Sequence, residues 1–144
     1  MKPFRLKLTH HLVLQYGLHE HMDCYVPHPA AYGELTQFHS EDYIQFLQRV
    51  LVTTADGKST NNLSHALCRK YNVGPSEDCP SFEGLYELSQ LIAGGSLDAA
   101  VQLGLGRTDI AIHWAGGFHH AKKSIASGFC YVNGNYTKKQ KTIL

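Results

Sequence analysis

Three stretches of the chain carry apolar residues at the spacing of an α-helix. The first follows Pro3, which suits the first position of a helix, and Gly17 is expected to end it. The second follows Ser40, which can cap a helix, and the third covers residues 82–103, with Gly94–Gly95 weakening its middle. The first pattern predicts an amphipathic helix that must pack on another part of the molecule. The apolar positions of the three patterns are Leu8, Leu12, Val13 and Tyr16, then Tyr43, Ile44, Phe46, Leu47, Val50 and Leu51, then Leu85, Leu88, Leu91 and Ile92.

Two short apolar runs between these helices predict strands. Residues 23–26 form a run that ends at Pro27, and residues 110–112 form a run that follows Asp109. The order helix, short strand, helices, strand is typical of an α/β protein. At 144 residues, the chain has the length of one small domain.

The composition excludes several classes of function. A net charge of +1 gives no basic surface of the kind that direct nucleic-acid binding needs. No run approaches the roughly 18 consecutive apolar residues of a membrane span, and no apolar signal core follows the first residues, so no membrane association or secretion is expected. The four cysteines lack C-x-x-C spacing, so neither a zinc knuckle nor a redox dithiol is indicated, and free thiols fit the cytosol or the nucleus.

The candidate chemistry follows the second predicted strand. Residues 114–117 break that strand with two glycines, and the adjacent pair His119 and His120 comes next. A loop at the carboxyl end of a parallel strand lines the ligand crevice of an α/β protein, and imidazoles there can accept and release protons near neutral pH. The alternative is a surface loop with two solvated histidines. A nucleophilic Cys130 paired with a histidine is a weaker hypothesis, because no feature of the sequence activates its thiol.

A longer string favours the catalytic interpretation. Residues 114–133 read WAGGFHHAKKSIASGFCYVN and closely resemble the active-site segment of the zinc-dependent histone deacetylases, class I in particular. The resemblance continues upstream through QFHSEDYIQFLQRV, YNVG and EDCPSFEGLYEL and covers nearly all of residues 1–133. It implies the N-terminal part of a three-layer α/β/α arginase-like deacetylase fold with a parallel sheet, in truncated form. Residues 134–144 depart from the family pattern and are expected to form a disordered polar tail.

The resemblance implies roles for individual residues. His119 and His120 match the two catalytic histidines that manage protons around the attacking water and the leaving lysine amine. Gly128 and Phe129 match the walls of a narrow tunnel for the methylene chain of the substrate, and an aromatic face packs well along an alkyl stem. Asp78 matches a rim aspartate that accepts hydrogen bonds from the substrate backbone.

The resemblance also implies a cofactor and partners. The family uses zinc, but its ligands, two aspartates and one histidine, lie on segments that do not occur here, so this chain is expected to hold no metal ligands. Lys2 matches a position that can contact an inositol phosphate bridging the enzyme to a corepressor. The implied partners are acetylated histone tails and corepressor complex subunits, and the implied location is the nucleus, with the cytoplasm as a second site.

Two hypotheses therefore describe this polypeptide. The first is a histone (protein-lysine) deacetylase by descent, which hydrolyses the acetyl-lysine amide in transcriptional repression and is expected to be inactive as these 144 residues alone. The second is a non-catalytic truncated fragment that binds corepressor partners through its N-terminal helices. A transcript that continues into a D-x-H segment would favour the first.

Overall fold

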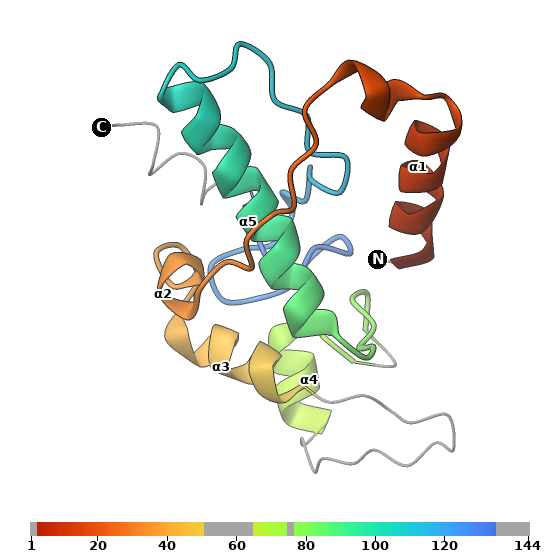
Figure 1. The fold of residues 1–144 in the computed structure, drawn as a ribbon. Coiled ribbons are helices and arrows are strands. Elements are labelled where there is room, and N and C mark those ends of the chain that lie inside the picture. The colour runs from red at the N-terminus through yellow and green to blue at the C-terminus, as the bar shows by residue number, and fades with distance from the viewer. Residues whose placement is uncertain (1–2, 51–64, 75–76, 135–144) are drawn as a thin grey trace.

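Helices make up the regular structure of the described part of the chain, which covers residues 3–50, 65–74 and 77–134 of a computed structural model (Figure 1). Within those ranges, sheet-type pairing is limited to isolated bridges, which join Val73 to Cys79, Lys122 to Ile125 and Ser127 to Cys130. The helices are α1 (Pro3–Gln15), the 3₁₀ helix η1 (Leu18–His21), α2 (Tyr32–Leu35), α3 (Glu41–Arg49), α4 (His65–Tyr71) and α5 (Leu85–Gly104).

Helix α5 is the element around which the other described segments are arranged. Figure 1 shows it crossing the body of the molecule, with α3 and α4 near its N-terminal end and α1 standing apart. The helix predicted over residues 82–103 is confirmed and continues without a break through Gly94–Gly95. Among the described residues no helix, α5 included, combines the length and the apolar character of a membrane span.

The two glycines in the middle of α5 allow other segments to pack closely on its backbone. A Cβ added at Gly94 would lie 1.7 Å from the carbonyl oxygen of His28, and one added at Gly95 would lie 2.6 Å from Nε2 of His113. Each glycine costs about 1 kcal/mol of helix propensity relative to alanine. The helix tolerates this cost because the segment before α2 lies directly against it, with the N–H of Ala30 donating to the carbonyl of Gln90 at 3.0 Å.

Helix α3 supplies the centre of the core. The apolar face predicted after Ser40 is confirmed as far as Val50, because four side chains of the helix and Val50 are buried, and Leu51 lies outside the described residues. The rings of Phe46 and Tyr71 lie 4.4 Å apart between centroids, which packs α3 against α4. Burial contributes roughly 1.5–3 kcal/mol for each side chain of this size, so this face fixes α3 in place. The buried residues of the helix itself are Tyr43, Ile44, Phe46 and Leu47.

Helix α1 forms as predicted, but its apolar residues are not packed as expected. The chain leaves the helix at Gly17, whose φ of 66° is the left-handed conformation that glycine adopts readily at helix ends. No residue of α1 is buried, and the side chains of Phe4 and Leu12 are 65% and 56% exposed. The prediction that this helix packs its apolar face is therefore wrong for the described residues.

Neither predicted strand forms among the described residues. Residues 23–26 and 110–112 are irregular, and Val26 and Ile110 are 92% and 75% exposed. A β-strand requires backbone hydrogen bonds to a neighbouring strand, and within the described ranges no β-bridge involves either segment. An apolar run is a local signal, whereas a strand needs a partner from elsewhere in the chain. The parallel sheet of the α/β prediction is accordingly not confirmed.

The end of the described chain is packed against the candidate histidine loop. Gly134 is buried, and its N–H donates to the carbonyl of Phe118 at 3.0 Å. Residues 135–144, which include most of the predicted polar tail, lie outside the described residues. The division into a partial domain over 1–133 and a tail over 134–144 stays a prediction.

Candidate active site

The two candidate catalytic histidines lie side by side on an exposed loop. The ring centroids of His119 and His120 are 4.2 Å apart with an interplanar angle of 34°, and both residues are exposed. Nδ1 of His119 lies 2.9 Å from the carbonyl oxygen of Gly117. Because a carbonyl oxygen can only accept, Nδ1 donates the hydrogen in this bond. In the neutral form of His119 this leaves the lone pair on Nε2, where it can accept a proton.

A tight turn places Gly128 against the second histidine. Ser127 and Cys130 exchange two backbone hydrogen bonds, of 3.1 and 2.8 Å, across the turn. The central residues, Gly128 and Phe129, both have positive φ, 50° and 63°, which is the signature of a type I′ turn. A Cβ added at Gly128 would lie 2.9 Å from Cγ of His120, so the turn backbone rests directly on that imidazole.

Phe129 projects from the tip of this turn in a conformation that is unusual for its residue type. Its φ of 63° is left-handed, and its side chain is 58% exposed. Left-handed conformations of residues other than glycine cost about 1–2 kcal/mol and cluster at functional sites. The turn thus presents Phe129 to solvent directly after Gly128, the residue that contacts His120, and the tunnel-wall role of Phe129 stays a prediction.

The segment that carries Asp78 is fastened to the same turn. Burial raises the pKa of the Cys79 thiol, and a hydrogen bond with the backbone of Phe129 opposes that rise. The hydroxyl of Tyr131 donates to the carbonyl of Pro80, which ties the segment to the chain just after the turn. The Asp78 carboxylate itself is exposed. An exposed carboxylate next to an anchored segment is compatible with a rim position, and the rim role of Asp78 stays a prediction.

The structure also shows residues that support the site and that sequence reasoning missed. The Nδ2 group of Asn133 donates to the carbonyl oxygens of His119 and Ala121, both at 2.8 Å. The hydroxyl of Tyr43, on α3, donates to the carbonyl of Tyr131 at 2.7 Å. The helical spacing of apolar residues predicted that Tyr43 lies on the apolar face of a helix, but it did not predict the hydrogen bond of its hydroxyl. Asn133, as a polar residue closing an apolar run, was the available signal for a buried hydrogen-bond donor.

The described residues do not fit a zinc site. Within the described ranges, no group of three or more His, Cys, Asp or Glu side chains is arranged to hold a metal ion. A catalytic zinc needs about three protein ligands and an open position. Lys2, the predicted inositol-phosphate contact, lies outside the described residues.

Comparison with known proteins matches the sequence of this chain to a family. The histone deacetylase domain matches residues 1–136. The chain is 54% identical to "Histone deacetylase 9" of Arabidopsis thaliana, 51% to "Histone deacetylase HDAC1" of Drosophila melanogaster and 50% to "Histone deacetylase 1" of Homo sapiens, in each case over 92% of its own length. It spans 29%, 24% and 26% of those relatives, respectively. With a matched domain over nearly all of its residues, the chain belongs to the histone deacetylase family.

Proposed function

We propose that this chain carries the proton-transfer and substrate-holding part of a protein-lysine deacetylase. The observation that carries the proposal is the packing of Gly128 against His120, whose ring lies beside that of His119. The exposed Phe129 directly follows Gly128 in the same turn. A substrate with an alkyl stem and a polar amide at its end matches both kinds of group.

The reaction needs two proton transfers, which the histidine pair can perform. Hydrolysis breaks the bond between the acetyl carbonyl carbon and the lysine nitrogen, and adds water to give acetate and a free amine. One proton leaves the attacking water and one reaches the leaving nitrogen. Nε2 of His119 can accept the first, since Nδ1 donates to the carbonyl of Gly117. The neighbouring imidazole of His120, with its centroid 4.2 Å away, can deliver the second.

The remaining site residues suit the stem and backbone of a peptide. The ring of Phe129 can pack along the four methylene groups of lysine, and Asp78 can accept hydrogen bonds from peptide N–H groups. Acetylated histone tails are therefore the proposed substrates, and the nucleus is the proposed location. The relatives named above are histone deacetylases by name, which supports this choice.

Peptide binding without turnover is the expected behaviour of the 144-residue chain. The described residues supply acceptors and a tunnel wall, but no group of three potential metal ligands. A nuclear magnetic resonance titration with an acetyl-lysine peptide tests this. We expect shifts at His119, His120 and Phe129 with the acetylated peptide and none with the same unacetylated peptide. Acetate release is followed in the same tube with and without added Zn²⁺.

Each outcome of that titration has a defined meaning. Shifts that depend on the acetyl group and disappear in Phe129→Ser support the substrate-holding role. Equal shifts with both peptides, or none at all, would remove the basis for the proposed function. Acetate release that requires His119 and His120 would show that the chain completes its own hydrolytic site, contrary to the expected lack of turnover.

A second candidate function is supported by α1. This helix has no buried residue and exposes Phe4, Leu8, Leu12 and Leu14. Figure 1 shows it standing away from α5, so its surface is accessible to another protein. A non-catalytic module that binds a corepressor subunit would use such a helix. Leu8→Ser combined with Leu12→Ser separates the two functions, because it should abolish subunit binding while leaving the peptide-induced shifts at Phe129 unchanged.

A further inference from the structure

We propose that His39 is a positioning residue, which fixes the loop of His119 and His120 through a neutral imidazole that bridges Lys123 and Asn133. His39 precedes α3 and is only 1% exposed. It touches neither candidate catalytic side chain, so any effect on them must pass through the backbone. The importance of that effect for catalysis rests on the proposed function, but the bridge itself does not.

The hydrogen bonds of His39 permit a single tautomer. Nδ1 lies 3.2 Å from the carbonyl oxygen of Lys123, and Nε2 lies 3.0 Å from the backbone nitrogen of Asn133. A carbonyl oxygen can only accept and a backbone N–H can only donate. The proton must therefore sit on Nδ1 and the lone pair on Nε2. Neither the other tautomer nor the imidazolium can make both bonds.

The bridge continues from His39 to the catalytic loop. Asn133, whose backbone N–H is held by Nε2 of His39, uses its side-chain amide to bind the carbonyls of His119 and Ala121 at 2.8 Å each. The carbonyl of Lys123 also accepts the N–H of Ser40 at 3.0 Å. Lys123 and Asn133 are thus fastened to the residues just ahead of α3, and two further points of the loop, His119 and Ala121, are fastened through Asn133.

The surroundings of His39 favour the neutral form. Burial lowers the pKa of the imidazole, opposed by hydrogen bonds to the backbone of Lys123 and Lys122. The aromatic neighbours are Phe38 and Tyr43, with ring centroids 4.8 and 5.5 Å from His39. Tyr43 packs its titratable ring against the imidazole, whereas Lys122 and Lys123 meet the imidazole through their backbone. A proton on Nε2 would face the N–H of Asn133 and break that bond.

Two isosteric variants of His39 separate the two bonds. The amide nitrogen of His39→Asn falls near the position of Nδ1 and can still donate to Lys123, but the variant has no acceptor for Asn133. The amide oxygen of His39→Gln falls near Nε2 and can still accept from Asn133, but the variant loses the bond to Lys123. We therefore expect His39→Gln to keep the link to the catalytic loop and His39→Asn to lose it.

The experiment is hydrogen exchange and ring nitrogen spectroscopy on the 144-residue chain. The wild-type ring should show the Nδ1–H tautomer. The exchange rate of the Asn133 amide should rise about tenfold in His39→Asn, as for the loss of one hydrogen bond, and stay within about threefold in His39→Gln. The ring resonances of His119 and His120 should move in the first variant and not in the second. The amide of Ala93, buried in α5, reports whether the fold is intact.

A further variant tests the second step of the bridge. Asn133→Asp keeps the backbone N–H for His39 but removes the amide donors to His119 and Ala121. It should shift the rings of His119 and His120 while the Nδ1–H tautomer of His39 persists. An Nε2–H tautomer in the wild type, or unmoved catalytic rings in both Asn133→Asp and His39→Asn, overturns the proposal. These readouts use no peptide, so a failure of acetyl-lysine binding would count against the proposed function alone.

Discussion

Gly94 of α5 lies in direct contact with the backbone of His28, and a Cβ added there would come within 1.7 Å of the His28 carbonyl oxygen. Gly94→Ala must therefore displace the chain segment that precedes α2, which is also held by the Ala30–Gln90 hydrogen bond of 3.0 Å. We expect a loss of about 1–3 kcal/mol in the free energy of unfolding, typical of overpacking in a core. Denaturant unfolding measures it.

Two other glycines of α5 provide matched controls for that substitution. The atoms nearest to a Cβ at Gly95 belong to the His113 side chain and not to backbone, so Gly95→Ala should cost less than Gly94→Ala. A Cβ at Gly104 meets nothing within 4 Å, so Gly104→Ala should change stability little or raise it by up to about 1 kcal/mol through helix propensity. Equal effects of all three would contradict the close approach at Gly94.

The glycine pair also shows what local patterns can and cannot predict. The sequence indicated a helix over residues 82–103, and α5 confirms the helix. Of its predicted apolar face, Leu85 and Ile92 are buried, whereas Leu88 is half-buried and Leu91 is exposed. It did not indicate why Gly94–Gly95 stands in the middle. The reason is a contact with His28, which lies more than sixty residues away in the chain, and no local pattern encodes such an approach.

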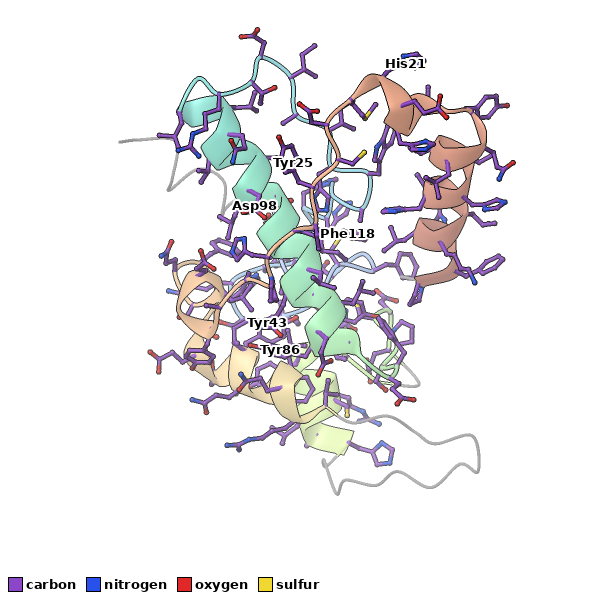
Figure 2. The ribbon with its side chains drawn as sticks, in the orientation of Figure 1. His21, Tyr25, Tyr43, Tyr86, Asp98 and Phe118 are labelled. Atoms are coloured by element: carbon purple, nitrogen blue, oxygen red, sulfur yellow. The ribbon has the colours of Figure 1, made fainter. Side chains whose placement is uncertain are left out.

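The hydroxyl of Tyr43 is expected to be one of the polar groups on which the site depends. It donates to the carbonyl of Tyr131 at 2.7 Å in a fully buried environment. Tyr43→Phe would leave that carbonyl without this donor, and we expect a loss of about 1–3 kcal/mol in the free energy of unfolding. Tyr86→Phe is the control, because its hydroxyl accepts an exposed bond from Gln48 at 3.1 Å and its loss should cost less than about 0.5 kcal/mol. Figure 2 labels both tyrosines.

The side chain of Phe129 is expected to serve peptide binding and not stability, because its backbone conformation is unfavourable for a residue other than glycine. Its left-handed φ of 63° suits glycine, and its ring is 58% exposed, so Phe129→Gly should leave stability within about 1 kcal/mol of the wild type. The same variant should lose the acetyl-lysine-dependent shifts in the peptide titration. A large loss of stability would instead assign the ring a packing role and weaken the tunnel-wall interpretation.

Gly128 is expected to tolerate no side chain. Its φ is 50°, and a Cβ would lie 2.9 Å from Cγ and 3.0 Å from Cβ of His120. Gly128→Ala should therefore displace the imidazole of His120, visible as a change in its ring resonances, and lower stability by about 1–2 kcal/mol. Gly84→Ala is a suitable control, since Gly84 also has positive φ, 72°, but its Cβ would meet nothing within 4 Å. The control should lose stability without moving His120.

The candidate site was predictable only in part. The residues at its front are consecutive or nearly so in one string, so resemblance could assign His119, His120, Gly128 and Phe129 together. The hydrogen bonds that support these residues join positions far apart in the sequence. The N–H of Asn133 donates to Nε2 of His39, 94 positions away, and the hydroxyl of Tyr43 donates to the carbonyl of Tyr131, 88 positions away. Pairings at such separations are fixed by the packing of α3 against the loop, which a single sequence does not specify.

His28 and His39 should respond to pH in opposite directions. His28 lies 2.7 Å from Asp98 through Nδ1 and 3.1 Å from Glu34 through Nε2. Burial lowers its pKa, but the hydrogen bonds and charges of Glu34 and Asp98 outweigh this and raise it above 6.5. Figure 2 shows Asp98 on α5, beside the chain segment that leads from Tyr25 toward α2. The pKa of His39 lies below 6.5, chiefly because the residue is buried.

The direction in which pH changes stability follows from comparing the pKa of each histidine in the folded chain with 6.5, the ordinary value in an unfolded chain. The contribution of His28 to stability is fully present below pH 6.5 and is lost as the pH rises through its raised pKa. The contribution of His39 is present above pH 6.5 and is lost as the pH falls through its lowered pKa. Acid should therefore tighten the contact of the chain before α2 with α5 while loosening the histidine loop.

A titration of the histidine Cε1–H resonances tests both signs in one sample. The midpoint of His28 should lie above 6.5 and that of His39 below it. Asp98→Asn should lower the midpoint of His28, because it removes the charge 2.7 Å from Nδ1, and leave that of His39 unchanged. If both midpoints lie on the same side of 6.5, one of the two predicted pKa directions is wrong. The Asp98→Asn sample shows which resonance belongs to His28, and therefore which prediction is wrong. If only the predicted pKa direction of His28 is contradicted, the proposed bridge from His39 to the catalytic loop is unaffected, since the two imidazoles contact different segments.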